Sequence, residues 1–505
     1  MPHTYIKRIL DARIYDLAVE TPLTEARLMS VRTKNTVWLK REDLQPVFSF
    51  KVRGAYNKLR QLTQEQRDGG VIAASAGNHA QGLAMAAKHM GVNAVIVMPR
   101  TTPAIKVDAV RRRGARVVLQ GDTYDEASAY AKQLVEEKGM TYVPPYDDPD
   151  VIAGQGTVAV ELLRQHPDHI DAVFIPVGGG GLCAGMAAYI KYVRPEIKVF
   201  AVEPDDAACL KAAMDKNRRV VLPQVGLFAD GVAVAQIGKE TFRVIKSCID
   251  GVITCTTDEI CAAIKDIFED TRSIAEPAGA LALAGLKKYV VEQGCENQTL
   301  IAIDSGANTN FDRLRYISER TEIGEQREAI FAVTIPEKPG SYKQFCSALG
   351  RRNITEFNYR YADKSQAHIF VGLQVSAEHN DRQKLAEHLR GKGYELMDMT
   401  DNEMAKMHIR HMVGGHTPRA VEDEVVYRFE FPERPGALLG FLTKLAGRWN
   451  ISMFHYRNHG AAYGRVLVGM QVSEDERKEV VKFLDDLNYP YWEETQNPAY
   501  QYFLA

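Results

Sequence analysis

A lysine among apolar side chains is the first feature of this sequence that could perform covalent chemistry. Lys51 is flanked by Phe50 and Val52, and Phe48 lies close before it. Burial of an ammonium group is costly unless a partner offsets it. Desolvation also lowers the pKa of a lysine, which an imine-forming amine requires. A surface lysine in a loop would explain this segment equally well, so Lys51 alone leaves both interpretations open.

A turn of small residues follows the apolar run 71–74. Ser75, Gly77, Asn78 and His79 lie between this predicted strand and a predicted helix. The free N–H groups at the start of a helix suit an anion such as a carboxylate. The carboxamide of Asn78 could hydrogen-bond a substituent on a planar ring. His79 could act as a base, although a histidine in a first helical turn more often has a structural role.

A glycine-rich segment is the third motif, and it consists of Gly178, Gly179, Gly180, Gly181 and Leu182. It directly follows a predicted strand at 172–177 and precedes a predicted helix at 183–193. Glycines let the backbone adopt conformations that other residues resist, and so wrap a phosphate at a helix N-terminus. No Lys-Ser/Thr pair follows as in a Walker loop, and the segment is a poor dinucleotide fingerprint. A flexible linker explains the glycines less well, because a strand and a helix flank them.

The fourth motif is the end of a buried apolar strand. Residues 300–303 are apolar, and Asp304 and Ser305 follow them. Neighbouring residues of a strand point to opposite faces, so Asp304 and Ser305 cannot both reach the same ligand atom.

The elements that position these motifs alternate between short strands and helices. The predicted strands are 71–74, 94–98, 117–119, 172–177, 199–202 and 300–303. This alternation predicts an α/β fold with a mostly parallel, doubly wound sheet and helices on both faces. Binding sites in such folds lie at the carboxyl ends of the strands, so we expect the motifs to share one crevice.

An internal repeat begins after about residue 320. The segment 331–340 returns at 427–436, and three further blocks recur in the same order: 353–355 at 450–452, 358–360 at 455–457, and 371–375 at 468–472. Each copy predicts a strand, a Pro-Gly turn, a helix, two strands, a helix and a strand, which is an α+β sandwich with an antiparallel sheet. We therefore predict three domains at 1–320, 328–412 and 424–505, with a linker at 413–419.

Composition limits the class of protein. The 505 residues include 63 basic and 65 acidic side chains, a balance that argues against nucleic acid or an anionic membrane as the main partner. No segment has the roughly 20 apolar residues of a spanning helix, and the N-terminus has no signal-peptide pattern. Seven cysteines without a C-x-x-C pair are typical of reduced thiols. We expect a soluble, cytoplasmic protein.

In this order the four motifs resemble those of the fold type II (tryptophan synthase β-like) pyridoxal-phosphate enzymes, and with the repeated tail the chain resembles the biosynthetic threonine deaminases among them. The resemblance implies that Lys51 forms an imine with pyridoxal 5′-phosphate and that Phe50 lies in the cofactor site. It also implies that Asn78 contacts the ring 3-hydroxyl and that Ser305 meets the pyridine nitrogen. The phosphate would be held by Gly178, Gly179, Gly180, Gly181 and Leu182, and the substrate carboxylate by Ser75, Gly77 and His79.

The activity implied by this resemblance is that of a lyase. It is the β-elimination and deamination of L-threonine to 2-oxobutanoate and ammonia, the first step of isoleucine biosynthesis. The freed amine of Lys51 would remove the Cα proton, and the cofactor ring would delocalise the resulting charge. Ser305 cannot stabilise a protonated ring nitrogen as an aspartate would, which favours rapid loss of the β-hydroxyl group.

Two departures separate the chain from the serine racemases of this fold. Their motif has a second serine that acts as a base, whereas Ala76 stands here and has no proton to give; racemisation is therefore disfavoured. Their metal site also looks incomplete, because Glu203 and Ala207 match but Cys209 replaces a carboxylate. We assign no metal.

The repeated tail resembles ACT domains, whose small ligands bind near the Pro-Gly turn and the following helix. Tyr342, Phe357, Tyr359 and Arg360 are candidates for effector contacts, although packing of the sheet explains them as well. The family implies inhibition by isoleucine, antagonism by valine and a homotetramer.

Two other functions remain open at this stage. A serine dehydratase or a β-replacing synthase could share the catalytic motifs, although the repeated tail counts against both. A non-enzymatic amino-acid sensor could retain a vestigial cofactor site, but the intact Lys51, glycine segment and Ser305 count against it.

Overall fold

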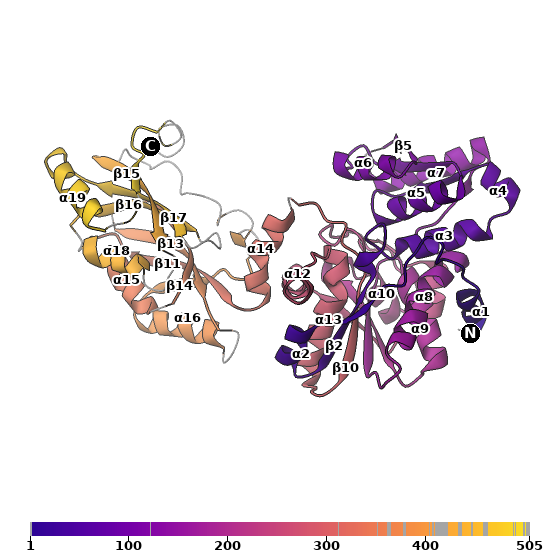
Figure 1. Cartoon of the computed structure of the whole chain (residues 1–505). Helices are drawn as coiled ribbons and strands as arrows, with labels where there is room; N and C mark the ends of the chain where they lie inside the picture. The colour runs from indigo at the N-terminus through magenta and orange to yellow at the C-terminus, as the bar shows by residue number, and fades with distance from the viewer. Residues whose placement is uncertain are drawn as a thin grey trace. The chain divides into compact units, whose positions relative to one another are not determined.

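The computed structural model describes residues 3–500 except for 122, 312, 351, 361–364, 377–379, 403–404, 407–408, 410–422, 433–436, 446–447, 458–462, 488, 490 and 498–499. The chain forms two compact units, Met1–Thr321 and Glu322–Ala505, which are described in turn (Figure 1). The predicted linker at 413–419 lies outside the described residues. The predicted boundaries of the three domains stay a prediction.

The larger sheet of the first unit has six strands. Their order is β1 (Leu23–Glu25), β2 (Thr36–Arg41), β10 (Thr299–Asp304), β7 (Ala172–Pro176), β8 (Lys198–Pro204) and β9 (Gly251–Cys255). All neighbouring pairs are parallel except β1 with β2. Alternate residues of β7 enter two different hydrophobic cores, Val173 and Ile175 one and Ala172 and Phe174 the other. The sheet is therefore buried on both faces, which explains why its strands are almost continuously apolar.

Helices cover both faces of this sheet. One layer contains α1 (His3–Leu10), α8 (Pro149–Gln165), α9 (Gly181–Val193), α10 (Cys209–Asp215) and α11 (Lys239–Ile245). The other contains α2 (Arg27–Thr33), α12 (Thr257–Thr271) and α13 (Pro277–Gln293). Both long central helices begin with a proline in the first turn, and Asp148 caps α8 through the N–H groups of Asp150 and Val151. Proline suits this position because its missing N–H would have had no intrahelical acceptor.

A second, smaller sheet lies in the same unit. It has four parallel strands in the order β5 (Arg116–Leu119), β4 (Ala94–Met98), β3 (Val71–Ala74) and β6 (Thr141–Tyr142). The helices that alternate with these strands are α3 (Lys51–Gln61), α4 (Gln64–Asp68), α5 (Asn78–Met90), α6 (Ala104–Arg112) and α7 (Tyr124–Lys138). The predicted alternation of parallel strands and helices is confirmed, but the strands belong to two sheets and not to one. In Figure 1, α4 to α7 form a lobe of their own above α8, α9 and α13.

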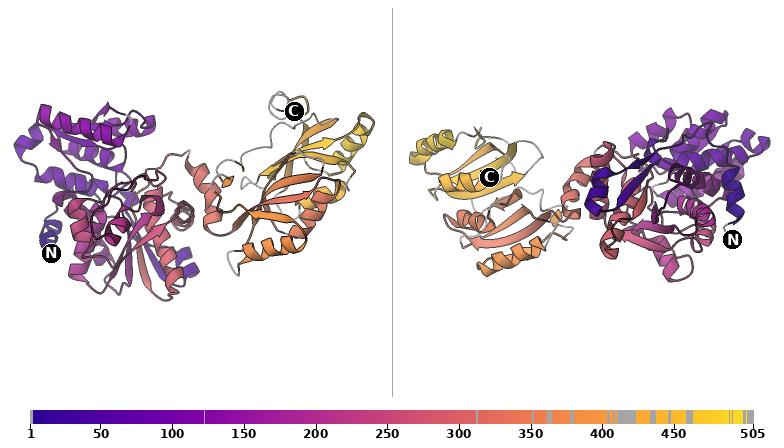
Figure 2. Two further views of the ribbon diagram at one scale, coloured as in Figure 1. Left: turned by 180° about the vertical axis from the view of Figure 1, so that it is seen from behind. Right: turned by 60° about the horizontal axis from the view of Figure 1, so that its bottom comes forward.

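The second unit contains one antiparallel sheet of eight strands, built from the two repeats. The first repeat comprises β11 (Glu328–Pro336), α15 (Ser341–Leu349), β12 (Ile354–Arg360), β13 (Gln366–Gln374), α16 (Asp381–Gly391) and β14 (Glu395–Asp398). The second comprises β15 (Glu424–Pro432), α18 (Ala437–Leu445), β16 (Asn450–Arg457), β17 (Tyr463–Gln471), α19 (Arg477–Leu487) and β18 (Tyr491–Glu493). The predicted order of strands and helices is confirmed in both copies, and the second Pro-Gly turn, at 435–436, lies outside the described residues. The four helices pack on one face of the sheet, where they share a single core with the strands (Figures 1 and 2).

The two repeats join edge to edge through β12 and β16, so the strand order is β14-β11-β13-β12-β16-β17-β15-β18. Phe357 pairs with Tyr456, and Tyr359 pairs with Phe454. In the repeat alignment Tyr456 corresponds to Tyr359, and Phe454 to Phe357. Each strand thus presents the same residues to the other, which is the pattern of a two-fold related interface.

No helix among the described residues has both the length and the apolar character needed to cross a membrane.

Candidate active site and regulatory pocket

Backbone contacts bring Lys51 and Ser305 to the same place. Helix α3 begins at Lys51, and Ser305 directly follows β10. The backbone N–H of Phe50 donates to the carbonyl of Ser305 at 3.3 Å, and Ser49 forms an isolated bridge with Gly306. Two of the predicted cofactor contacts are therefore neighbours, although they lie at opposite ends of the catalytic sequence.

The amine of Lys51 lies in a partly buried position beside an aromatic ring. Its Nζ donates to the carbonyl of Pro145 at 3.0 Å and lies 5.2 Å from the centroid of the Phe50 ring. Burial lowers the pKa of Lys51 to about 8, and the charge of Glu276 opposes this shift. A useful fraction of the amine is consequently neutral, and so nucleophilic, near neutral pH.

The glycine segment forms the turn between β7 and α9. Gly180 has a φ of 91°, a left-handed conformation that favours glycine. A β-carbon on Gly179 would lie 2.2 Å from the ring of Tyr146. Helix α9 begins at Gly181, and the first N–H groups of a helix have no intrahelical acceptor. The turn therefore offers backbone donors to an anion such as a phosphate.

Residues of two other segments, 145–147 and the start of α11, contact this glycine turn or Lys51. Thr241 donates its hydroxyl to the carbonyl of Gly179 at 2.7 Å. The carboxylate of Asp147 accepts hydrogen bonds from three N–H groups at the start of α11, including that of Thr241. Pro145 and Tyr146 precede Asp147 and contact Lys51 and Gly179. The segment 145–147 thus connects the amine to the glycine turn.

The carboxamide of Asn78, at the start of α5, is held on both sides. Its Nδ2 donates to Oε1 of Glu276 at 2.6 Å, and its Oδ1 accepts from Nδ2 of Asn308 at 2.7 Å. The charge of Glu276 also acts on Lys51. Asn78 is therefore close to the lysine and fixed in orientation.

The predicted carboxylate site lies at the start of the same helix. Gly77 occupies the N-cap position of α5, and its N–H donates to Oγ of Ser75 at 3.4 Å. His79 is buried, and its Nε2 lies 2.9 Å from the carbonyl of Val143. Burial and the charge of Lys51 lower the pKa of His79 to about 4. A neutral imidazole whose N–H faces a carbonyl has no donor left for a carboxylate, so His79 can contribute there through its backbone N–H only.

Ser305 and Asp304 point to different sides of β10, as the alternation of a strand requires. The hydroxyl of Ser305 donates to the carbonyl of Ala278 at 3.2 Å. Asp304 faces Arg41, with Nε and Oδ2 separated by 3.7 Å, and burial together with the charge of Asp43 raises its pKa well above the usual range. Asp304 is therefore engaged with charged groups, whereas the hydroxyl of Ser305 donates to a backbone carbonyl and Ser305 lies beside the start of α3.

Glu203, the residue that matches a racemase metal ligand, has a structural role here. Its two carboxylate oxygens accept hydrogen bonds from the N–H groups of Leu210 and Lys211, at 2.7 and 2.8 Å. Cys209 donates its thiol to the carbonyl of Gly178 at 3.6 Å. Among the described residues no group of three or more metal-ligating side chains was found.

Sequence reasoning missed four residues that build this site, namely Tyr146, Thr241, Glu276 and Asn308. They act by packing or by contacting other site residues, and such roles leave no pattern along the chain. Only Glu276 had a signal, because it directly precedes a proline at the start of an apolar helix.

These groups match the chemical parts of pyridoxal phosphate. The glycine turn, whose space a β-carbon would fill, suits the phosphate, and the amine of Lys51 suits the aldehyde. The hydroxyl of Ser305 suits an uncharged ring nitrogen, because its proton can rotate from the carbonyl of Ala278 to that nitrogen. The amide of Asn78 suits the ring hydroxyl. The residues present therefore fit this cofactor.

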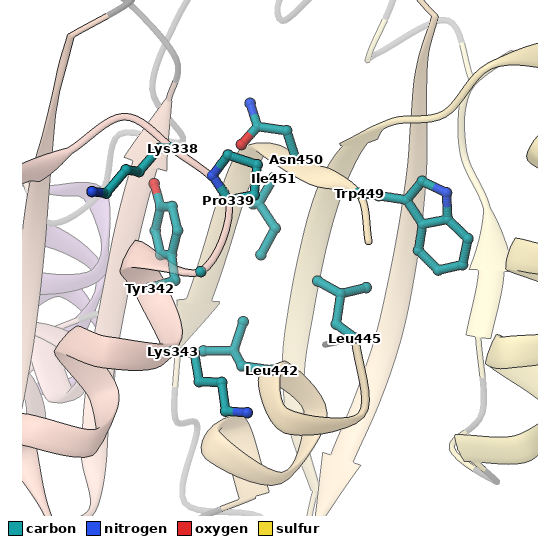
Figure 3. A pocket seen from close by; sticks show the side chains of 10 residues that line it. Lys338, Pro339, Tyr342, Lys343, Leu442, Leu445, Trp449, Asn450 and Ile451 are labelled. Carbon is teal, nitrogen blue, oxygen red and sulfur yellow. The ribbon is translucent and has the colours of Figure 1, made fainter. Parts of the chain in front are cut away.

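A pocket in the second unit lies between the repeats. It encloses about 310 Å³, part of it open to solvent, and its walls are Lys338, Pro339, Gly340, Tyr342, Lys343, Leu442, Leu445, Trp449, Asn450 and Ile451. Figure 3 shows Leu442 and Leu445 projecting from α18 opposite the Pro339 turn.

The four predicted effector residues are only partly gathered at this pocket. Tyr342 lines it, and its ring packs edge-on against Tyr359, with centroids 5.1 Å apart. Phe357 and Tyr359 are buried in the sheet core and are absent from the described pocket wall. The side chain of Arg360 lies outside the described residues.

Comparison with known proteins identifies the family. The model of the pyridoxal-phosphate dependent enzymes matches residues 14–306, and the model of the C-terminal regulatory domain of threonine dehydratase matches 319–409 and 417–504. The biosynthetic L-threonine dehydratase of Burkholderia multivorans is 56% identical over 100% of this chain and 99% of its own length. That of Escherichia coli is 53% identical over 99% and 97%.

The chain belongs to the pyridoxal-phosphate dependent enzymes, in the branch of the biosynthetic threonine dehydratases. It is thus a lyase that uses pyridoxal phosphate, and its tail is a regulatory domain of the type found in that branch. The fold class inferred from the sequence is confirmed.

Solved structures resemble the catalytic part of the chain. A processed threonine deaminase from Solanum lycopersicum has a TM-score of 0.62 at 48% identity and covers 63% of this chain and 93% of its own. Maize serine racemase has a TM-score of 0.59 at 32% identity, covering 62% and 95%. The racemase likeness shows that the fold alone does not separate these activities.

Proposed function

We propose that this enzyme converts L-threonine to 2-oxobutanoate and ammonia, as the first step of isoleucine biosynthesis. The observation that carries the proposal is the convergence of the Lys51 amine, the glycine turn and Ser305 in one crevice. The names of the full-length relatives support the choice of substrate. Water is lost from Cα and Cβ, and hydrolysis of the remaining C–N bond releases ammonia.

Lys51 both attaches the cofactor and moves the substrate proton. Bound pyridoxal phosphate supplies an electron sink that stabilises negative charge at the substrate Cα. Once released, the Lys51 amine stays tethered beside that carbon, and the pKa of about 8 lets it accept a proton near neutral pH. The uncharged hydroxyl of Ser305 does not stabilise a protonated ring nitrogen as an aspartate would. The ring is then a weaker electron sink, which favours prompt loss of the β-hydroxyl group.

The start of α5 holds the substrate carboxylate. Ser75 supplies a hydroxyl, and the N–H groups at and after Gly77 point toward the crevice end of the helix, where the helix dipole favours an anion. Because His79 is neutral and engaged with Val143, this binding depends on backbone donors.

The test is a direct assay with purified, cofactor-loaded enzyme. We expect 2-oxo acid from L-threonine, with a higher kcat/KM than from L-serine, and no D-amino acid. The Ala76→Ser variant should still form no appreciable D-threonine or D-serine, because one added hydroxyl does not reproduce the rest of a racemase site. A protein that forms no 2-oxobutanoate from threonine would overturn the proposal.

The second unit is the sensor of the end product. The pocket between the repeats combines the apolar side chains of Leu442, Leu445 and Ile451 with the cationic side chains of Lys338 and Lys343. An aliphatic amino acid carries the matching groups, a branched side chain and a carboxylate. Isoleucine binds there and inhibits the enzyme, and valine competes with it and relieves the inhibition.

Filling the pocket separates regulation from catalysis. Leu442→Phe adds bulk to the apolar wall of the pocket, where a larger side chain would clash with the bound amino acid. The isoleucine concentration needed for half-inhibition should rise at least about tenfold, which corresponds to a loss of about 1.4 kcal/mol of binding free energy. Lys444→Ala, an exposed position on the same helix, is the matched control and should behave as wild type. Unchanged inhibition in Leu442→Phe, with the variant folded, would place the effector elsewhere.

The assembly is a homotetramer in the cytoplasm. The resemblance to the biosynthetic threonine deaminases implies the tetramer, and the balanced charge supports a protein free of nucleic acid and membrane. Sedimentation equilibrium of the loaded enzyme measures the oligomer, and a monomer at micromolar concentration contradicts it.

A further inference from the structure

The carboxamide of Asn78 belongs to a short chain of hydrogen bonds whose two ends are groups that only accept. Asn308 donates through Nδ2 to the carbonyl of Val47 and to Oδ1 of Asn78, both at 2.7 Å. Asn78 then donates through Nδ2 to Oε1 of Glu276 at 2.6 Å. A backbone carbonyl and an ionised carboxylate have no proton to donate, so both amides can point in one direction only.

Glu276 is rigidly placed at its end of this chain. It is 3% exposed, its N–H donates to the carbonyl of Gly306 at 3.0 Å, and the next residue begins α13. A β-carbon on Gly306 would lie 2.9 Å from Oε1, and one on Gly231 would lie 3.3 Å from it. Two glycines thus make room for this carboxylate.

Neighbouring groups shift the pKa of Glu276 in both directions. Burial and the charge of Asp230 raise its pKa to about 7. The hydrogen bond from Asn78, the charge of Lys106 and the backbone of Asn308 act in the opposite direction. The carboxylate is therefore mostly ionised above about pH 7, and the hydrogen bond from Asn78 is one of the contacts that favour this form.

Two N–H bonds leave Nδ2 of Asn78, and Glu276 accepts one of them. The second is directed away from Glu276 by the planar geometry of the amide, and the side of Oδ1 is closed by Asn308. We propose that Glu276 is the positioning residue that selects this orientation of Asn78, so that the amide presents a donor, and never its oxygen, to the ring hydroxyl oxygen of the cofactor. The inference rests on the proposed cofactor contact of Asn78.

Binding of pyridoxal phosphate to the apoprotein tests this inference without using turnover. Glu276→Gln can donate as well as accept, so Asn78 can then turn its oxygen to the ring. We expect the Kd of pyridoxal phosphate to rise about tenfold, as for one oriented hydrogen bond to a charged oxygen, and the visible absorbance band to shift. The matched control is Glu203→Gln, which removes another buried carboxylate with a pKa near 7 and should change the Kd less than about twofold.

A double-mutant cycle shows whether Glu276 acts through Asn78. In the Asn78→Ala background the further change Glu276→Gln should have no effect on the Kd, because no amide remains to orient. The cofactor analogue 3-deoxypyridoxal phosphate, which lacks the ring 3-oxygen, should bind wild type and Glu276→Gln equally. If Glu276→Gln fails to fold, Asn308→Ala removes the other restraint on Asn78 and should weaken pyridoxal phosphate in the same way.

The inference is overturned if Glu276→Gln binds pyridoxal phosphate like wild type, or if its effect persists in the Asn78→Ala background. Failure of the wild-type protein to bind pyridoxal phosphate is a different result, because it overturns the proposed function itself.

Discussion

At the scale of the residue, the chemistry depends on one amine held beside a ring and a carbonyl. Lys51→Ala removes the amine but keeps the apolar contacts of the first turn of α3, so we expect the fold to persist. The variant should lose the visible band of bound pyridoxal phosphate and lose turnover by more than about a thousandfold. Absorbance and 2-oxo acid release measure the two effects. Lys132→Ala, on the exposed side of α7, is the control and should retain both.

The pKa of Lys51 predicts how fast the apoprotein captures its cofactor at different pH. Only the neutral amine attacks the aldehyde, and burial has lowered the pKa to about 8. The capture rate should therefore rise with pH up to about 8 and level off above it, whereas an ordinary lysine would continue to gain up to roughly pH 10. Borohydride trapping followed by mass spectrometry of the Lys51 peptide gives the rate. A plateau that appears only near pH 10 would contradict the desolvated environment.

Single residues were predictable from the sequence only where their chemistry depends on their neighbours in the chain. Lys51, the glycine turn and Ser305 each lie next to the strand or helix end that exposes them, and a pattern along the chain reveals this. Glu276 and Asn308 act on Asn78 from far away in the sequence. The sequence places His79 at the substrate carboxylate, but its ring lies at hydrogen-bond distance from the carbonyl of Val143. No local pattern could show that contact.

At the scale of the element, the close approach of the glycine turn to Tyr146 gives a steric prediction. Gly179→Ala places a β-carbon 2.2 Å from the Tyr146 ring, so either the turn or the ring must move. We expect at least about tenfold weaker binding of pyridoxal phosphate, measured by titration of the apoprotein. Gly391→Ala, where the same β-carbon would meet nothing within 4 Å, should bind the cofactor normally. Equal affinities would show that the turn does not hold the phosphate.

The first turn of α3 is anchored by a buried network of charges. Two positions after Lys51, Arg53 is fully buried and pairs with Glu42 at 2.7 Å and Glu161 at 2.5 Å. Arg53→Met leaves two buried carboxylates with Lys40 as the remaining cation. The free energy of unfolding should fall by about 3–5 kcal/mol, which denaturant titration measures.

The exposed ion pair of Arg111 with Asp108 supplies the control for Arg53. Arg111→Met should change the free energy of unfolding by less than about 0.5 kcal/mol, since surface pairs contribute little. Similar losses in the two variants would mean that burial does not set the strength of the Arg53 network.

The elements themselves were largely predictable, but their grouping was not. Apolar strands alternating with helices fixed the α/β class, and the repeat predicted the elements of the second unit. The separation into two parallel sheets depends on which strands pair, such as β3 with β4 and β6. Pairing is set by contacts distant in sequence, and the period of apolar residues along a strand is the same in either sheet.

At the scale of the whole molecule, Asp230 joins three parts of the first unit. Its Oδ2 lies 2.5 Å from Nζ of Lys106 on α6, in the smaller lobe. Its Oδ1 lies 3.3 Å from Nη1 of Arg313, the first residue of α14. Gly231, the next residue, lies against Glu276 and Asn78. The carboxylate is therefore shared between α6 of the small lobe and α14, and its charge acts on Glu276 in the site.

Helix α14 (Arg313–Gly324) continues past Thr321, where the first unit ends, and the first strand of the regulatory sheet begins soon after it. Helix α14 thus begins at a residue that pairs with Asp230 and ends in the second unit. The proposed inhibition by isoleucine requires a coupling free energy between two sites, and we predict that Asp230 contributes to it.

Asp230→Asn should consequently weaken inhibition more than catalysis. The amide keeps the size of the side chain but removes the charge that both cations share. We expect the isoleucine concentration for half-inhibition to rise by about three- to tenfold, a coupling loss of roughly 1 kcal/mol, while isoleucine binding in the absence of threonine stays near wild type. Asp108→Asn, a neutralised exposed carboxylate also on α6, is the control. If Asp230→Asn lowers kcat but leaves the inhibition curve unchanged, Asp230 contributes to catalysis and not to the coupling.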